Sequence, residues 1–442
     1  MSLRTRLLPA ALVTLLAALA GCAPNPFPTE TQRRMMEPAQ KAEARGDFEA
    51  AFGEYARLAE GGTPFAQYKL GRMYEKGIGT EPSDDLAAKW YRASAESGYP
   101  PAEIALGKLY EQGSGVPQDY AAALALYRRA VEYEQSYEYE LDPPSFPAEA
   151  HVRAGQLIEL GRGTAANPAE AARYYEAAAE AGNPDGAFAL AELYRKGEGV
   201  AADPAAADRW YAAAAASYAS PERAADARAK ERLGDMYLAG HGVPKDVPRG
   251  LALLDEAAKE RTSAQLRLAD LFGGEDGGIA SDPARAAGYY RMAADAGRAD
   301  GMYRLAELYA TGEGVPEDGG HAVELYQQAA AAGEPRAYGK LADLYAAGVV
   351  VPEDDMEANA LFAEGARHGD GRAAMRLGQS YEEGVAVAAD PVQALGWYKI
   401  ADALGEDRAS AEIGRLEPEL EAAQIQQATE IAEAWQRENG AS

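Results

Sequence analysis

The stretch that decides the fold runs from residue 301 to residue 337 and reads GMYRLAELYATGEGVPEDGGHAVELYQQAAAAGEPRA. Its apolar residues recur three or four positions apart on both sides of a break that is rich in glycine and contains a proline. The same frame begins at Ala66, Ala102, Ala150, Ala187, Ala229, Ala264, Gly301, Ala337 and Ala373. Nine such repeats predict a solenoid in which each unit buries its apolar face only against its neighbours.

Each repeat is predicted to contain two short helices. In the first repeat they cover residues 66–76 and 84–97, where Leu70, Tyr74 and Trp90 follow the spacing of amphipathic helices. Glycines after the first helix suit the left-handed conformation that ends a helix, and aspartates before the second helix suit its N-terminus. The predicted fold class is therefore all-α, a solenoid of antiparallel helix pairs.

The repeat resembles the Sel-one-like repeat family, a relative of the tetratricopeptide repeat. The resemblance is carried by Leu305–Tyr309, Gly312–Pro316, Ala322, Tyr326, Ala329, Ala330 and Gly333. It implies right-handed superhelical stacking, protein–protein assembly and no shared catalytic residues. Two repeats depart from the pattern: Leu253-Leu254 stands in place of an aromatic pair, and Phe272-Gly273-Gly274 disturbs the end of a first helix.

The nine repeats are predicted to occupy residues 66–408, with insertions near 131–148 and 218–227. Residues 37–65 are predicted to form a tetratricopeptide-like cap, and residues 409–442 are predicted to form a capping helix. Such caps cover the stacking faces that terminal repeats would otherwise expose.

The N-terminus has the pattern of a bacterial lipoprotein signal peptide over residues 1–22, with basic residues followed by an apolar run. It ends in Leu19-Ala20-Gly21-Cys22, which resembles a lipobox, and Cys22 is the only cysteine. We therefore predict that Cys22 is lipidated; an ordinary signal peptide with an incidental cysteine is the alternative. By resemblance to bacterial lipoproteins, Ala23 favours the periplasmic face of the outer membrane. Residues 23–36 are predicted to be a tether without helical structure.

Charge and motif content narrow the function. The chain has 70 acidic and 43 basic residues and a formal net charge of −27, which argues against nucleic acid as a partner. The four histidines fall at unrelated repeat positions, and no metal-binding or nucleophile motif is present, so we predict no cofactor, no metal site and no enzymatic activity.

A column of basic residues is less expected in so acidic a chain. It lies three residues after the start of seven repeats and comprises Lys69, Arg153, Arg232, Arg267, Arg304, Lys340 and Arg376. From the fifth repeat to the eighth, an acid follows three residues later, which predicts ion pairs within one helix. In the first three repeats Arg72, Lys108 and Gln156 replace the acid. A strip available for a partner is therefore predicted at Lys69, Arg72, Lys108 and Arg153.

The first insertion offers a second candidate contact. It contains Tyr133, Tyr137 and Tyr139 among glutamates. These tyrosines either extend the preceding helix into a longer loop or form a docking element, because exposed tyrosines are common in interfaces.

These observations predict a non-enzymatic scaffold that is lipid-anchored in the bacterial envelope. Among Sel-one-like lipoproteins the chain resembles the scaffold of alginate export. That resemblance implies an outer-membrane porin and a polymer-synthesis complex as partners. The alternative is a regulatory or sensing module that binds a peptide or a cell-wall fragment.

Overall fold

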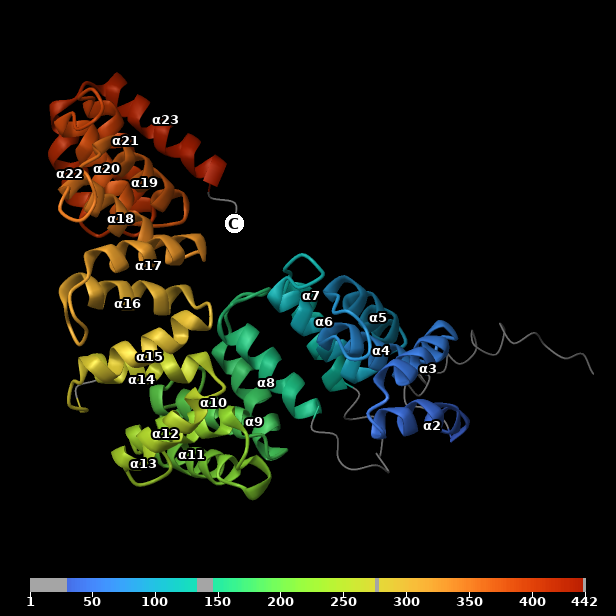
Figure 1. Cartoon of the computed structure of the whole chain (residues 1–442). Helices are drawn as coiled ribbons and strands as arrows, with labels where there is room; N and C mark the ends of the chain where they lie inside the picture. The colour runs from blue at the N-terminus through green and yellow to red at the C-terminus, as the bar shows by residue number, and fades with distance from the viewer. Residues whose placement is uncertain (1–29, 133–145, 275–277, 440–442) are drawn as a thin grey trace, which may run out of the picture. The chain divides into compact units, whose positions relative to one another are not determined.

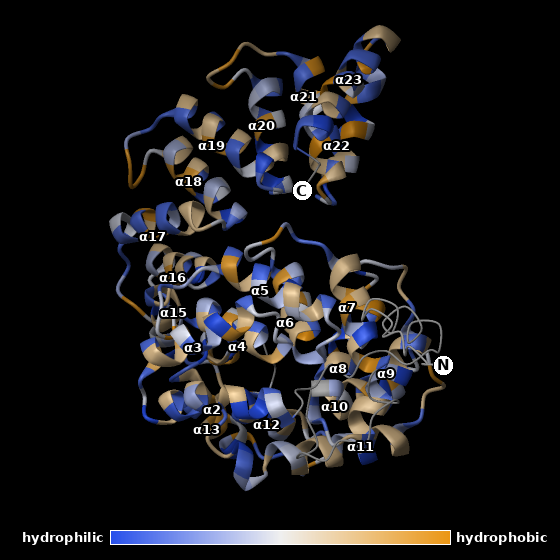
Figure 2. Cartoon of the chain, turned by 90° about the vertical axis from the view of Figure 1, so that its right-hand side faces the viewer, coloured by the Kyte–Doolittle hydropathy of each residue, from blue (hydrophilic) through white to orange (hydrophobic). Residues whose placement is uncertain are grey.

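The computed structural model describes residues 30–132, 146–274 and 278–439. These residues form 22 α-helices, two short 3-10 helices and no strand (Figure 1). In this part of the chain, no helix combines the length and the apolar character needed to span a membrane. Hydrophilic and hydrophobic residues alternate along the helices in Figure 2, as expected for helices that bury one face. The predicted all-α fold of helical repeats is confirmed.

The chain divides into two compact units, one comprising Met1–Arg223 with Gly240–Pro244 and the other comprising Ala224–Ala239 with Lys245–Ser442. The first unit contains the helices α2 (Glu30–Ala44), α3 (Phe48–Glu60), α4 (Pro64–Lys76), α5 (Asp84–Glu96), α6 (Pro100–Gln112), α7 (Tyr120–Glu132), α8 (Phe146–Glu159), α9 (Pro168–Glu180), α10 (Pro184–Lys196), α11 (Pro204–Tyr218) and η2 (Pro221–Arg223). The second unit contains α12 (Ala227–Ala239), α13 (Val247–Ala258), α14 (Thr262–Gly273), α15 (Pro283–Asp295), α16 (Ala299–Thr311), α17 (Gly319–Ala331), α18 (Pro335–Ala347), α19 (Asp355–Arg367), α20 (Gly371–Glu383), α21 (Pro391–Ala403), α22 (Ala409–Leu416), η3 (Glu417–Glu419) and α23 (Ala422–Asn439).

The two helices of each repeat pack against each other, and we call them helix A and helix B. The helices A are the even-numbered helices α4 to α20, and the helices B are the odd-numbered helices α5 to α21. The frame of the fourth repeat differs from the prediction. Helix α10 begins at Pro184 as α4 begins at Pro64, so the residue that matches Ala66 is Gly186 and not Ala187.

Glycine ends helix A, as predicted, because the loop needs a positive φ angle. Gly314 has φ 74°, and a Cβ atom added there would lie 2.2 Å from the carbonyl carbon of Pro283 in the preceding repeat. The next loop has Val350 at the same place. There the small residue is Gly319 instead, where an added Cβ would lie 2.6 Å from Cγ2 of Val350. The loop still lies close to the start of the preceding helix B, but here the larger residue is in the loop and the glycine is in the helix.

An aspartate caps most of the helices B. Asp119, Asp203, Asp282 and Asp390 each accept a backbone N–H hydrogen bond from the first turn of the helix that follows. The first repeat differs, because Ser83 is the cap and the predicted aspartates lie within the first turn. A carboxylate there still interacts favourably with the helix dipole.

Tyrosines from helix B fill the space between the two helices of a repeat. The four that lie against a helix A glycine are Tyr91, Tyr127, Tyr175 and Tyr398, which face Gly71, Gly107, Gly155 and Gly378. Each of these tyrosines is at most 1% exposed. A Cβ added at any of these glycines would lie 2.6 to 2.7 Å from a tyrosine ring carbon. Glycine at this position therefore sets how closely the two helices can pack.

Both ends of the repeat array carry additional helices. At the N-terminal end, Met36 and Tyr55 are buried in one cluster with Leu70 of the first repeat. Residues 30–36 are helical where we predicted a tether, because this turn of α2 carries Met36 into that cluster. At the C-terminal end α23 packs on α21 and buries Ala428 and Ala432.

Candidate functional site

One face of helix A has three positions, three residues apart, at which ionisable residues recur from repeat to repeat. In α4 they are Lys69, Arg72 and Glu75, and we call them the first, middle and last positions of the helix A face. The middle position is held in the nine repeats by Arg72, Lys108, Gln156, Glu192, Asp235, Asp270, Glu307, Asp343 and Gln379. The last position is acidic at Glu75, Glu111, Glu159 and Glu382. The carboxylate therefore stands at the last position in α4, α6, α8 and α20 and at the middle position in α10, α12, α14, α16 and α18.

The structure pairs three of the four basic residues in the predicted strip. Nζ of Lys69 lies 3.2 Å from a carboxylate oxygen of Glu43, and Nζ of Lys108 lies 2.5 Å from one of Glu149. Arg153 contacts a carboxylate oxygen of Glu149 and one of Glu111, each at 3.3 Å. The prediction that these residues lack acidic partners is wrong, because most of the partners come from neighbouring helices rather than from the same helix three residues later.

Glu149 is the centre of this charge cluster. Its partial burial would raise the pKa of its carboxyl group, but Lys108 and Arg153 outweigh this effect and hold the pKa below its ordinary value. The carboxylate therefore stays ionised at neutral pH and keeps both cations in place.

Arg72 differs from the other members of the strip, because it makes no ion pair in residues 30–132, 146–274 and 278–439. Its guanidinium carbon lies 5.9 Å from the ring centroid of Tyr68. Arg72 and Lys108 line a pocket of about 390 Å³ on α4, α6 and α8, together with Tyr68, Glu75, Lys76, Tyr91, Ile104 and Glu149. The structure thus brings two of the four predicted binding residues into one pocket, and a role in partner binding stays a prediction.

In the second unit the ion pairs run from one helix A to the next. Arg267 lies 3.1 Å from Asp235, Lys340 lies 3.4 Å from Glu307, and Arg376 lies 3.1 Å from Asp343. Each of these pairs joins the first position of one repeat to the middle position of the repeat before it. Of the four pairs predicted within one helix, the structure shows the pair between Arg304 and Glu307, at 3.4 Å. The column of basic residues thus joins successive repeats and also forms an ion pair within a single helix.

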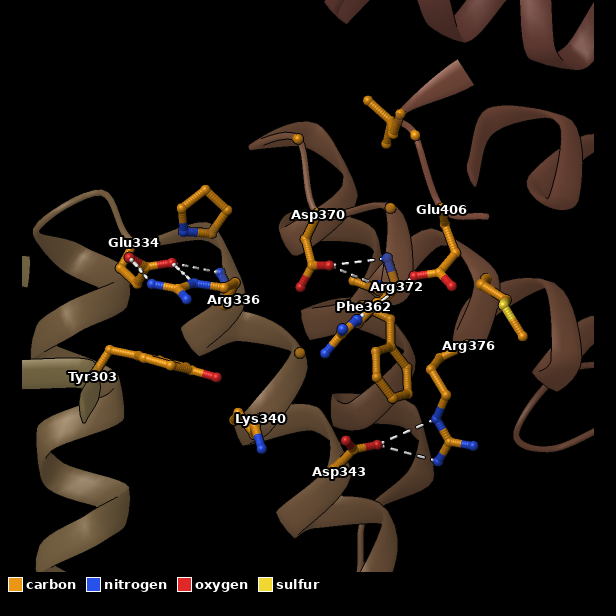
Figure 3. Close-up of a pocket in the computed structure, with 18 of the residues that line it drawn as sticks. Tyr303, Glu334, Arg336, Lys340, Asp343, Phe362, Asp370, Arg372, Arg376 and Glu406 are labelled. Carbon is orange, nitrogen blue, oxygen red and sulfur yellow. Dashed lines mark hydrogen bonds and ion pairs between the residues drawn. The ribbon is translucent and has the colours of Figure 1, made fainter. Parts of the chain in front are cut away.

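A pocket of about 900 Å³ lies on this face over α16, α18 and α20 (Figure 3). Six basic residues line it, namely Arg304, Arg336, Lys340, Arg372, Arg376 and Arg408. Five carboxylates line it, namely Glu307, Glu334, Asp343, Asp370 and Glu406. In a chain with a net charge of −27, this pocket is locally close to balanced in charge.

Arginine is the second residue of α18 and of α20, and Arg336 and Arg372 form a second row on this face. Figure 3 shows Arg336 beside Glu334, which it contacts through two nitrogens at 2.7 and 3.0 Å. The hydrogen bonds from Arg336 lower the pKa of Glu334. The same guanidinium lies 4.5 Å from the ring centroid of Tyr303. Arg372 is the most open member of the row: its side chain is 78% exposed and lies 3.6 Å from Glu406.

The tyrosine hydroxyl groups of helix B are functional contacts that the sequence reasoning missed. They donate hydrogen bonds to the carboxylates of the helix A face in Tyr91–Glu75 (2.5 Å), Tyr175–Glu159 (2.6 Å), Tyr290–Asp270 (2.6 Å), Tyr398–Glu382 (2.8 Å), Tyr127–Glu111 and Tyr211–Glu192. Burial and the neighbouring carboxylate both raise the pKa of these phenols, so they remain donors. In four repeats a glutamate stands sixteen residues before the tyrosine, and this recurring spacing is the sequence feature that could have predicted the hydrogen bond.

Within residues 30–132, 146–274 and 278–439 no group of three or more metal-ligating side chains is found. His241 and His368 instead stack on Tyr211 and Tyr338, with ring centroids 4.5 and 5.1 Å apart.

Four residues of the predicted site lie outside the residues that the structure describes. These are the predicted lipidation residue Cys22 and the insertion tyrosines Tyr133, Tyr137 and Tyr139. Their roles stay predictions.

The chain is similar to solved structures of other helical-repeat proteins. A protective antigen of uropathogenic Escherichia coli with an SLR fold is 27% identical, with 88% of this chain and 95% of that chain covered and a TM-score of 0.34. A Sel1 repeat protein from Oxalobacter formigenes is 28% identical, with 59% of this chain and 96% of that chain covered and a TM-score of 0.45. A search of curated proteins gives no match.

The Sel1 repeat model matches the chain nine times, over residues 64–99, 100–132, 148–183, 184–217, 227–260, 262–297, 299–334, 335–370 and 371–405. These matches begin within two residues of the nine helices A. Proteins with this repeat generally mediate protein–protein interactions and are typically non-enzymatic. With nine matched repeats over more than half of its length, the chain belongs to the Sel1 repeat family.

Proposed function

We propose that the protein is an assembly scaffold that holds an extended segment of a partner protein in the pocket on α16, α18 and α20. The observation that carries this proposal is the pairing of charges in that pocket. Rows of cations and carboxylates alternate along three consecutive helices A, with Arg376 paired to Asp343 and Lys340 paired to Glu307.

Paired charges favour a polypeptide over a polyanion. An incoming anion would have to displace an internal carboxylate from each cation, and the released carboxylate would then repel it. A segment that carries both lysine and glutamate side chains can exchange one ion pair for another. Tyr303 and Phe362 lie beneath the pocket and are only 5% and 3% exposed, so the surface offered to the segment is mainly charged.

The cellular setting is a second part of the proposal. We infer a lipid anchor at Cys22 and a position at the periplasmic face of the outer membrane, supported by the basic, apolar and lipobox-like order of residues 1–22. We infer a role in assembling an exopolysaccharide export complex, with a porin and a polymer-synthesis complex as partners. The support for this role is the resemblance to the alginate-export scaffold.

Photo-crosslinking from the pocket tests the proposal. A benzoylphenylalanine placed at Arg372, whose side chain is 78% exposed, should capture a protein of the export complex in intact envelopes. The matched control is the same probe at Met356 on α19, a residue that is 74% exposed and lies on a helix B. We expect capture from position 372 only, and the substitution Lys340→Glu together with Arg376→Glu should abolish it.

Three outcomes would change the proposal. Equal capture from both positions would show that the pocket is not the binding surface. Capture of a sensor protein from position 372 would support the regulatory alternative instead. For the anchor, the substitution Cys22→Ser should release the protein from membranes, and mass spectrometry that finds an unmodified Cys22 in the membrane fraction would contradict it.

A further inference from the structure

Glu103, in the first turn of α6, is fully buried and poorly bonded. Its side chain is 0% exposed, and neither carboxylate oxygen accepts an aligned hydrogen bond from any residue that the structure describes. Nη2 of Arg129 lies 2.6 Å from Oε1 of Glu103 and also donates a hydrogen bond to the carbonyl oxygen of Ala95, at 2.7 Å, so Arg129 is the one cation in contact with this carboxylate among the described residues. An ionised carboxylate in such a place loses its hydration, and the single contact with Arg129 does not compensate for that loss, because burial still raises the pKa of Glu103.

Equivalent positions in other repeats show what this site is built to hold. Gln67 in α4 and Gln265 in α14 are both buried, and Nε2 of each donates to the carbonyl oxygen of an alanine in the preceding helix, at 3.2 and 2.7 Å. In α18 the hydroxyl group of Tyr338 donates to the carbonyl oxygen of Ala330, at 3.3 Å. In these three helices a donor at this position bonds the end of the preceding helix, whereas Ala187, Met302 and Ala374 occupy the position in other repeats.

Ala95 provides the matching carbonyl group for Glu103, eight residues earlier in the chain, as Ala330 does for Tyr338. A carboxylate has no proton to donate, whereas a carboxylic acid has the shape of the glutamine amide and one O–H donor. We propose that Glu103 is a proton-binding residue that locks α6 onto α5 when protonated and releases this contact when it ionises.

The charged groups around Glu103 set the pH at which this happens. Burial raises the pKa of Glu103 to about 7, against the effect of Arg129 and with the help of Glu132. Both of these groups lie on α7, while α5 presents the carbonyl group of Ala95. The pKa in the folded chain is above the ordinary value of 4.5, so the folded state binds the proton more tightly than the unfolded chain. The stabilisation is complete below that ordinary value and is lost as the pH rises through about 7.

Protonation of Glu103 can affect the pocket on α4, α6 and α8, because α6 carries Glu103 and also residues that line this pocket. Ile104, which follows Glu103, and Lys108, one turn further on, line the pocket on α4, α6 and α8. Loosening of α6 above neutral pH would therefore alter that pocket as well as the junction between the first two repeats.

The test compares the full chain with its Glu103→Gln variant between pH 5 and pH 8.5. Hydrogen exchange of the α6 backbone amides reports local opening, which is needed because repeat proteins do not unfold in one step. We expect protection factors within about fourfold of each other at pH 5 and, near pH 8.5, a variant that is more protected than the wild type by on the order of 10²-fold. The ratio should change with a midpoint near pH 7. A ratio that does not vary with pH would overturn the inference.

A gain-of-function variant provides a second test. Gln265→Glu should create the same proton dependence in α14, where Met292 stands in place of Arg129. The variant should be as protected as the wild type at pH 5 and less protected at pH 8.5. An infrared difference spectrum should show a protonated carboxyl band for the wild type at pH 6 that Glu103→Gln lacks. Absence of that band, or a Gln265→Glu variant without pH dependence, would contradict the proposal.

Discussion

The pocket on α4, α6 and α8 and the pocket on α16, α18 and α20 lie on the same face of equivalent helices. In the first pocket the middle position is basic, at Arg72 and Lys108, and the carboxylates stand one turn later, where they bond the tyrosines of helix B. In the second pocket the middle position is acidic, at Glu307 and Asp343, and pairs with the cation of the following repeat.

The difference teaches how a repeat can change its surface while it keeps its core. The carboxylate moves by one turn of helix A, and the buried tyrosine can bond it in either place, as Tyr91 does with Glu75 and Tyr290 does with Asp270. Where the middle position is basic, a guanidinium group such as that of Arg72 is left without an ion pair among the described residues. Where it is acidic, the cations join successive repeats.

The loops of the two regions give the largest expected contrast. Gly115, between α6 and α7, has φ 64°, and an added Cβ would lie 2.3 Å from the carbonyl carbon of Asp84. We expect Gly115→Val to lower the free energy of unfolding by about 3 kcal/mol or more. Val350→Gly, at the matching place between α18 and α19, should lower it by about 1 kcal/mol. Urea denaturation checks both variants. Equal losses would contradict the assignment of a left-handed conformation to Gly115 and not to Val350.

The helix-packing glycines give the next contrast. A Cβ added at Gly107 would lie 2.6 Å from Cε1 of Tyr127, whereas α16 has Ala306 at the same position. Gly107→Ala should destabilise the first unit by about 1–3 kcal/mol through overpacking. Ala306→Gly should cost the second unit about 1 kcal/mol through helix propensity. Thermal unfolding of both variants measures this, and a stabilised Gly107→Ala variant would show that α6 and α7 have room to separate.

The buried hydroxyl groups sharpen the comparison further. Tyr127 donates a hydrogen bond to Glu111, whereas the hydroxyl of Tyr326 in α17 makes none within residues 30–132, 146–274 and 278–439. Tyr127→Phe should cost about 1 kcal/mol, because it removes one partner of a partly buried carboxylate. Tyr326→Phe serves as the matched control and should be close to neutral. Similar losses for the two variants would argue that ring packing dominates and the carboxylate contact contributes little.

The smallest effect concerns the cations. Arg376 pairs with Asp343 and is half exposed, so Arg376→Gln should cost about 0.5 kcal/mol at low salt, with the cost falling as salt is added. Any loss of stability in Arg72→Gln should be the same at low and high salt, because Arg72 contacts the ring of Tyr68 and has no ion pair in the described part of the chain. Denaturation at low and high salt distinguishes the two variants. A salt-dependent loss for Arg72→Gln would indicate an ion pair in solution.

Short-range features could be predicted from the sequence. The repeat period, the helix pairs and the left-handed glycine that ends helix A, such as Gly312, all depend on neighbours within one repeat, and the structure confirms them. The predicted fourth frame is one residue late because Gly186 and Ala187 are both small, and the sequence alone does not show which of them makes the close contact between helices.

Contacts between repeats could not be predicted in the same way. Lys69 and its partner Glu43 are 26 residues apart, and their meeting depends on how α2 stacks against α4. A search for acids within one helix could not find this pair. The pocket on α16, α18 and α20 was missed for the same reason, since its charges come from three helices. The sixteen-residue spacing from Glu75 to Tyr91 recurs in the sequence and would have been visible.

The exchange of small and large residues at Gly319 and Val350 has a consequence for the order of the repeats. Val350 fits only behind a helix B that begins with glycine, and the helices α9, α11, α15 and α21 begin with proline at that place. The eighth repeat therefore cannot follow most other repeats without a collision. The units of this array are not interchangeable modules: an engineered array that moves the eighth repeat has to carry the seventh with it, or Val350 meets a residue larger than glycine.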